Sequence, residues 1–137
     1  MPTRESTVRT YVTLCIYPGT IEPSEISRRL HLRPTHAQRR GDPITKRRIA
    51  KLNGWFLSSQ GKVRSQSVER HFAWLVRRSE PIGRRRTLTA LRRAGVDMNI
   101  ACFWAPAQIG GGGPALSAAL LRSLAKLQIP VWFDVYP

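Results

Sequence analysis

Residues 8–17 read VRTYVTLCIY, and this run predicts the strand around which the fold is organised. It is rich in β-branched and aromatic residues, which favour strands. In a strand, alternate positions share one face, here Val8, Thr10, Val12, Leu14 and Ile16. That face is mostly apolar and predicts a sheet with one side turned to a core. A turn at Pro18-Gly19 ends the strand.

The next segments alternate between helical and extended patterns. Glu22-Pro23 predicts the start of a short helix, with proline at the first helical position. Residues 33–51 hold seven basic side chains around Gly41-Asp42-Pro43, and we expect a solvated loop there. Residues 54–59, GWFLSS, predict a second strand.

A helix over residues 67–79 follows from an apolar stripe at helical spacing. The stripe consists of Val68, Phe72, Leu75, Val76 and Ser79. The opposite side of this helix carries Arg70, Trp74, Arg77 and Arg78. A further basic helix, over residues 84–94, is expected to end at Gly95, because glycine favours the left-handed backbone found just past helix ends.

The remaining chain predicts a strand at 97–105, a helix and a last strand at 131–136. The helix has an apolar stripe of Leu116, Leu120, Leu124 and Leu127. The order β-α-β-α-α-β-α-β favours an α+β fold: a mixed four-stranded sheet with its helices packed on one face, ferredoxin-like or built from a duplicated β-α-β unit. The 137 residues, 42% of them hydrophobic, suit a single domain, 1–137.

Positive charge is concentrated in the first two thirds of the chain. Residues 1–93 hold 21 lysines and arginines against 6 acids, a balance of +15, whereas residues 94–137 hold 2 against 2. Such a balance favours polyanions or an acidic partner surface. Arginine outnumbers lysine 19 to 4, which suits planar contacts to phosphate or carboxylate, although a GC-rich coding bias gives the same ratio.

The location expected from the sequence is the cytoplasm. Cys15 and Cys102 both lie in apolar runs, as free buried thiols do, and suit a reducing compartment. The polar residues 1–8 lack the apolar core of a signal peptide. We expect no membrane association, because no apolar run approaches membrane-spanning length.

Several stretches in order resemble the bacterial family known as domain of unknown function 4279. The matching residues, after an early strand, are Glu22-Pro23-Ser24-Glu25-Ile26, Leu30-His31-Leu32-Arg33-Pro34-Thr35, Gly41-Asp42, Gly54-Trp55-Phe56-Leu57-Ser58-Ser59, Ser67-Val68-Glu69-Arg70-His71 and Phe133-Asp134-Val135-Tyr136. The resemblance covers nearly the whole chain. It implies no established activity, but some members look like candidate immunity proteins of toxin systems, which would be stoichiometric binders. The strong positive charge departs from that pattern, because an immunity protein facing a basic nuclease is normally acidic.

No catalytic, cofactor or metal signature appears in the sequence, so we expect a protein that is not an enzyme and holds no cofactor. Any triad would have to use His31, His36 or His71, and no local motif links them to an acid or a nucleophile. His31 and His36 are five apart across Pro34, which does not place them on one helical face as a zinc pair needs.

Two smaller features have a structural and a functional interpretation. Gly110 to Gly113 before a helix resembles a phosphate cradle, but no Lys-Ser/Thr follows, and a connector is the favoured interpretation. Asp134 lies in an otherwise apolar strand and is expected to form a structural ion pair with an arginine.

The candidate binding residues are the basic clusters together with one tryptophan that offers a stacking surface. They are Arg39, Arg40, Arg47, Arg48, Arg70, Trp74, Arg77, Arg78, Arg84, Arg85 and Arg86. A solvated face is the structural interpretation of these clusters. The leading functional hypothesis is a non-enzymatic binding module for an acidic protein surface. The alternative is a nucleic-acid binder without sequence specificity, since no known readout motif is present.

Overall fold

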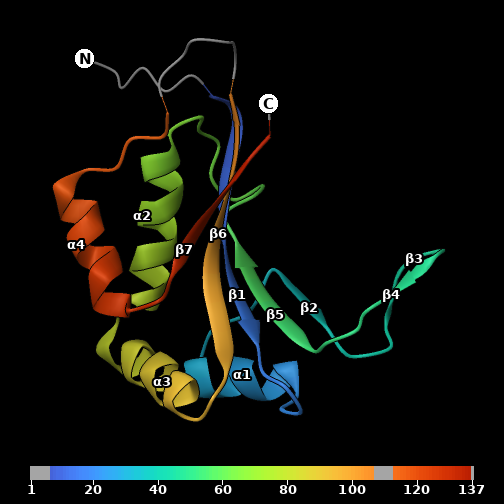
Figure 1. The fold of residues 1–137 in the computed structure, drawn as a ribbon. Helices are drawn as coiled ribbons and strands as arrows, with labels where there is room; N and C mark the ends of the chain where they lie inside the picture. Colours follow the sequence, from blue (N-terminus) through green and yellow to red (C-terminus); the bar gives the residue numbers. More distant parts are fainter. Residues whose placement is uncertain (1–6, 107–112, 137) are drawn as a thin grey trace.

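A computed structural model describes residues 7–106 and 113–136 (Figure 1). The elements, in chain order, are β1 (Thr7–Tyr17), α1 (Pro23–Leu30), β2 (His36–Gln38), β3 (Pro43–Thr45), β4 (Arg48–Ile49), β5 (Gly54–Ser58), α2 (Val68–Ser79), α3 (Ile82–Arg93), β6 (Asp97–Pro106), α4 (Ala118–Leu127) and β7 (Val131–Val135).

The main sheet has five strands in the order β2-β5-β1-β6-β7. The pairing of β6 with β7 is parallel and the other pairings are antiparallel. The α+β class and the mixed sheet predicted from the sequence are confirmed, but the predicted number of four strands is wrong. The fifth strand is β2, which joins the outer edge of β5 by pairing His36 with Phe56 and Gln38 with Gly54.

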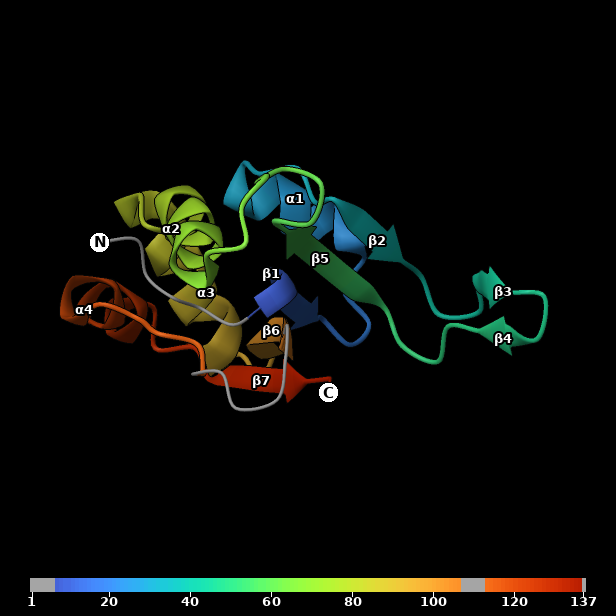
Figure 2. The same cartoon turned by 90° about the horizontal axis from the view of Figure 1, so that it is seen from above.

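All four helices cover one face of this sheet (Figure 2). The buried positions of β1 are Thr10, Val12, Leu14 and Ile16, as their alternation predicts, and Cys15 is buried too. They meet the apolar stripe of α2, in which Val68, Phe72, Leu75, Val76 and Ser79 are all buried. Trp55 of β5 is fully buried in the same core, and its indole N–H donates to Ser27 Oγ at 2.9 Å.

The two halves of the fold are not equivalent copies of one β-α-β unit. β6, α4 and β7 form a parallel β-α-β unit. In the first half, β1 and β5 are antiparallel neighbours, because the chain between them turns back through β2 and the β3–β4 hairpin.

A projecting hairpin, here called the arm, replaces the solvated loop predicted at 33–51. β3 and β4 pair with each other and form a separate two-stranded sheet that extends away from the domain (Figures 1 and 2). At its base, Gly41 N–H donates to Ala50 O at 2.8 Å and Ala50 N–H donates to Asp42 O at 2.7 Å. The prediction of a loop was wrong because it relied on apolar alternation as the sign of a strand. The residues that pair in β3 and β4 show no such alternation.

Among the described residues, the helices are too short or too polar to cross a membrane.

Candidate anion-binding surfaces

Four of the predicted residues lie in the arm or next to its base, and the side chains of three of them, Arg40, Arg47 and Arg48, are exposed. Arg39 Nε lies 3.0 Å from Glu22 Oε2, which fixes the base of the arm to α1. Arg40 N–H donates to Asn53 Oδ1 at 2.8 Å, while its side chain is exposed. Arg47 and Arg48 are exposed near the tip. The arm therefore presents cations beyond the sheet edge.

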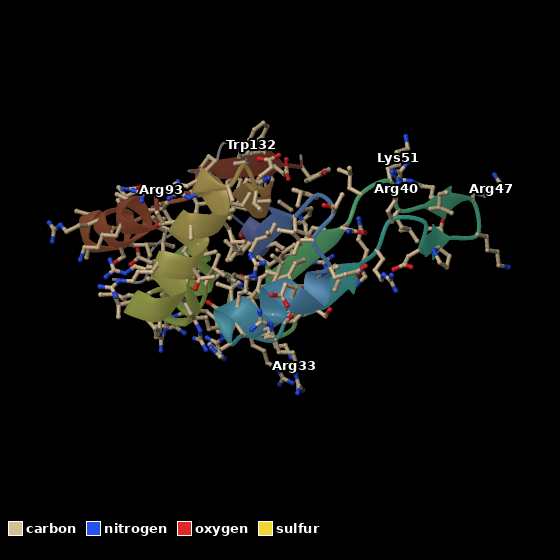
Figure 3. All side chains as sticks on the ribbon, turned by 90° about the horizontal axis from the view of Figure 1, so that it is seen from below. Arg33, Arg40, Arg47, Lys51, Arg93 and Trp132 are labelled. Atoms are coloured by element: carbon tan, nitrogen blue, oxygen red, sulfur yellow. The ribbon has the colours of Figure 1, made fainter. Side chains whose placement is uncertain are left out.

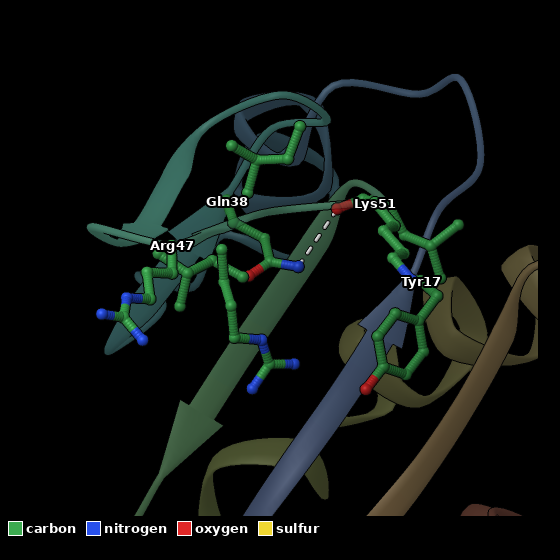
Figure 4. Close-up of a pocket in the computed structure, with 8 residues that line it drawn as sticks. Tyr17, Gln38, Arg47 and Lys51 are labelled. Carbon is green, nitrogen blue, oxygen red and sulfur yellow. Dashed lines mark hydrogen bonds between the residues drawn. The ribbon is translucent and has the colours of Figure 1, made fainter.

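A pocket of about 520 Å³ lies between the arm and the end of β1 (Figure 4). Its polar lining includes Arg47, Arg48 and Lys51, and Tyr17 of β1 closes the sheet side. No carboxylate of the described residues lines it. Gln38 Nε2 donates to Leu52 O at 3.1 Å across its mouth. The pocket is thus a cationic recess in which an acidic side chain would find opposite charges only.

Apolar side chains stand among these cations. Ile44, Ile49 and Leu52 are 51%, 64% and 58% exposed, and all three line the same pocket. An isolated two-stranded hairpin is only marginally stable in water. Exposed apolar groups on such a hairpin are unusual unless they meet another surface.

A second predicted group lies on α2, and its tryptophan is partly occupied. The Arg78 guanidinium lies 4.0 Å from the ring centroid of Trp74 and donates to Trp74 O at 3.0 Å. Burial lowers the pKa of Arg78, and the nearby charges of Arg77 and Arg84 lower it further. Trp74 itself packs against the core. One ring face therefore already holds a cation, which weakens the interpretation of Trp74 as a stacking surface for a ligand. Arg70 and Arg77 remain exposed.

The third predicted group, on α3, contains one arginine that is used by the fold. Arg84 donates to three backbone oxygens, those of Leu30 at 3.1 Å, His31 at 2.9 Å and Arg78 at 2.9 Å. These carbonyls belong to the C-terminal ends of α1 and α2, where helices lack internal donors and carry negative partial charge. Arg84 therefore braces three helices and is not a free binding residue.

The other two arginines of this group line a groove on the outer side of α3. The groove has a volume of about 700 Å³, and Arg85 and Arg86 share it with Arg93 and Lys126. Sequence reasoning missed Lys126, because it belongs to α4 and only the packing of α4 beside α3 brings it there.

The arm group and the α3 group do not merge into one surface. Figure 3 places Arg93 and Arg47 at opposite ends of the molecule, with Arg33 on a third side. Arg28, Arg29 and Arg39 form ion pairs, and their acids are Glu22 and Glu25. The hydrogen bonds from Arg28 and Arg29 lower the pKa of Glu25 to about 2. The structure thus offers a cationic surface on the arm that is separate from the one on α3, while the α2 and α3 groups adjoin each other at Arg78 and Arg84.

A serine–histidine pair, not predicted from the sequence, lies inside the domain. Ser59 Oγ is 2.5 Å from His71 Nδ1, and His71 Nε2 is 2.8 Å from Ser65 O. Because a carbonyl only accepts, Nε2 carries the proton and Nδ1 accepts from the Ser59 hydroxyl. Ser59 Oγ in turn accepts from Val12 N–H at 2.9 Å. Both residues are buried, and this chain of hydrogen bonds joins β1, the end of β5 and α2. His71 also lines a pocket of about 390 Å³, together with Tyr11 and Arg64.

The remaining titratable candidates are dispersed. Cys15 and Cys102 are buried, and burial raises the pKa of Cys15 to about 11. His36 stacks on Phe56, with ring centroids 5.8 Å apart, and His31 ends α1 with left-handed backbone. Within residues 7–106 and 113–136, the potential metal ligands do not gather in a group of three.

Two predictions about loops and strands have different outcomes. Asp134 is exposed and belongs to none of the ion pairs in the described part of the chain, so the predicted structural ion pair is wrong. It lies at the sheet edge, where water solvates the carboxylate. The second prediction, a connector at Gly110 to Gly113, falls mostly outside the described residues, which resume at Gly113.

The face of the sheet without helices carries an aromatic row that sequence reasoning missed. Tyr11 stacks on Phe103, and Phe103 stacks on Tyr136, each at 4.9 Å between ring centroids. The Arg9 guanidinium lies 5.5 Å from the Tyr11 ring centroid. The signal was present in the odd positions of β1 and β6, but which strands are neighbours had to be known before the row could be recognised.

Comparison with known proteins gave one match. A family described as Domain of unknown function (DUF4279) matches residues 7–137, nearly the whole chain. No curated protein and no solved structure matches.

Proposed function

The chain belongs to the DUF4279 family of domains of unknown function, and on that premise we propose that it is a non-enzymatic binding module whose arm holds an acidic protein partner. The observation that carries the proposal is the composition of the arm surface. Exposed Arg47, Arg48 and Lys51 surround exposed Ile44 and Ile49 in one recess without a carboxylate.

A protein partner fits this mixture better than a nucleic acid does. Protein interfaces combine apolar anchors with arginine, and a few such anchors supply most of the binding free energy. Interfaces with nucleic acids are more polar and much more positive, and they follow the phosphate backbone with a continuous basic surface. Here the cationic surfaces of the arm and of α3 are separate, and three apolar side chains of the arm are more than half exposed.

Two further features support the proposal. The Ser59–His71 pair is buried and fully hydrogen bonded, which suits a structural role. Cysteines buried in the core suit a reducing compartment, so the proposal includes a cytoplasmic location. An immunity-like role, which is part of the proposal, requires a toxin with an acidic surface, because charge complementarity guides association.

The test uses a labelled glutamate-rich peptide that also carries leucines, followed by fluorescence anisotropy. We expect binding to wild type and about tenfold weaker binding to the Arg47→Glu/Arg48→Glu variant, a loss of about 1.4 kcal/mol. The matched control, Lys62→Glu/Arg122→Glu, changes the net charge equally at two exposed positions outside the arm. Ile49→Asn is expected to weaken the peptide complex without any change of charge.

Equal weakening by the control variant would show that only total charge matters, and the arm proposal would then be wrong. No measurable binding of the peptide at low salt would also overturn it.

A nucleic-acid partner remains the second candidate because of the shape of the arm. A two-stranded ribbon fits the DNA major groove, and this one has Lys46, Arg47 and Arg48 at its turn. Single- and double-stranded oligonucleotides in the same assay distinguish the candidates. A nucleic-acid partner is favoured if the affinity for oligonucleotides falls steeply with salt concentration and is unchanged in the Ile49→Asn variant.

A further inference from the structure

The arginines of α3 divide into two sets that face different neighbours. Arg84 and Arg92, eight residues apart, turn towards the ends of adjacent helices. Arg92 donates to the backbone oxygen of Gln128 and, at 3.3 Å, to Gln128 Oε1, just past the end of α4. Together with Arg84, it satisfies the C-terminal carbonyls of α1, α2 and α4. These two guanidinium groups are therefore committed to the fold.

The second set lies along the outer face of the same helix. Positions 82, 85, 86, 89 and 93 follow helical spacing and form one stripe. Arg85, Arg86 and Arg93 are the cations of this stripe, and Thr89 contributes a hydroxyl between them. The stripe forms one wall of the groove of about 700 Å³, which Lys126 of α4 completes.

The groove has four positive side chains and, among the described residues, no negative one. Arginine does not lose its proton in proteins, so the repulsion between these groups cannot be relieved by deprotonation. The acids that form ion pairs in the described chain, Glu22 and Glu25, do so with arginines outside the groove. The repulsion can be relieved by an anion from solution.

One donor in the groove also lacks an acceptor. Arg85 Nε is shielded from solvent and has no hydrogen-bond partner in the described structure. Buried donors are almost always paired, so an unpaired one indicates a missing acceptor. An anion that draws the Arg85 side chain into the groove would supply that acceptor.

We propose that this groove binds a small ligand that carries two or more phosphate groups. Arginine forks match phosphate oxygens through paired hydrogen bonds. Arg86 and Arg93 are seven residues apart, about 10 Å along the helix, so a ligand with several phosphates contacts both ends better than a single phosphate does. This site is separate from the arm and does not depend on the proposed function.

The probe is inorganic pyrophosphate, compared with orthophosphate at matched ionic strength, in isothermal titration calorimetry of the full chain. We expect pyrophosphate to bind more tightly than orthophosphate to wild type. Arg86→Gln/Arg93→Gln is expected to weaken pyrophosphate binding about tenfold or more, because both residues lose their paired hydrogen bonds. Both positions are exposed, and unchanged urea unfolding would confirm that the variant folds.

The control is Lys62→Gln/Arg122→Gln, which removes the same charge from two exposed positions outside the groove and the arm and is expected to keep pyrophosphate affinity. If both double variants weaken binding equally, the effect comes from net charge and the groove is not a site. Equal affinity for orthophosphate and pyrophosphate would overturn the requirement for several phosphates. If the arm fails in the peptide assay while the groove variant still loses pyrophosphate, the groove stands without the proposed function.

Discussion

The Nε atom of Arg84 donates a hydrogen bond to the backbone oxygen of Leu30 at 3.1 Å, although 54 positions separate the two residues. The contact joins the first helix to the third, and the same guanidinium reaches the end of the second through Arg78 O. A residue predicted to bind a partner is thus a connection between three helices.

Replacing Arg84 with methionine should therefore destabilise the fold. We expect a loss of about 2–3 kcal/mol in the free energy of unfolding, because partly buried carbonyls lose charged donors. Urea unfolding followed by circular dichroism measures it. Arg86→Met, at an exposed position of the same helix, should stay within about 0.5 kcal/mol of wild type. Similar losses in both variants would mean that Arg84 has no special structural role.

Ser59→Ala should destabilise the domain from inside. The hydroxyl accepts from Val12 N–H and donates to His71 Nδ1, so its loss leaves two buried groups without partners. The expected cost is about 1–3 kcal/mol. Ser24→Ala, at an exposed position of α1, is the control in the same unfolding experiment. An unchanged unfolding midpoint for Ser59→Ala would contradict the hydrogen-bond chain described here.

Cys15 should react slowly with thiol reagents in the native protein. Burial raises the pKa of its thiol from 9.0 to about 11, so the thiolate is scarce at pH 8. Its folded pKa lies above the unfolded one, so the stability linked to it is complete below pH 9 and is lost as the pH rises towards 11. Labelling with a chromogenic disulfide before and after addition of denaturant measures the difference. Rapid labelling of native protein, traced to Cys15 by mass spectrometry, would contradict this account.

Gly54→Ala should be destabilising although it adds a single methyl group. A Cβ at this position would lie 2.6 Å from Cζ of Phe56, which stacks on His36 of β2. Moving that ring costs about 1–3 kcal/mol by overpacking and disturbs the edge of the sheet. Gly83→Ala in α3 meets nothing within 4 Å and should be neutral or slightly stabilising. Equal midpoints for both variants in thermal unfolding would show that Phe56 moves without cost.

The sequence predicted what local patterns determine. The alternation in β1 and the stripe of α2 identified buried residues correctly, because burial on one face leaves a regular period along the chain. The edge strand β2 left no such signal, since it is three residues long and pairs with β5 near Phe56. Its stabilising bonds come from residues that are distant in sequence.

The candidate site was predicted in composition but not in arrangement. Charge alone does not distinguish Arg84, which donates to helix ends, from Arg86, which faces the groove, because the difference depends on how α1 and α2 pack beside α3. Lys126 was missed for the same reason. The exposure of apolar residues in the arm, such as Ile49, was not predicted, because the surrounding charged residues show no pattern that distinguishes a buried from an exposed position.

The two limbs of the arm meet at its base, where Gly41 N–H donates to Ala50 O and Ala50 N–H donates to Asp42 O. Most substitutions between Gly41 and Ala50 leave the interior of the domain untouched. The surface of the hairpin can therefore change while the scaffold stays constant. Exchanging the residues between Gly41 and Ala50 for another short hairpin should leave the domain folded.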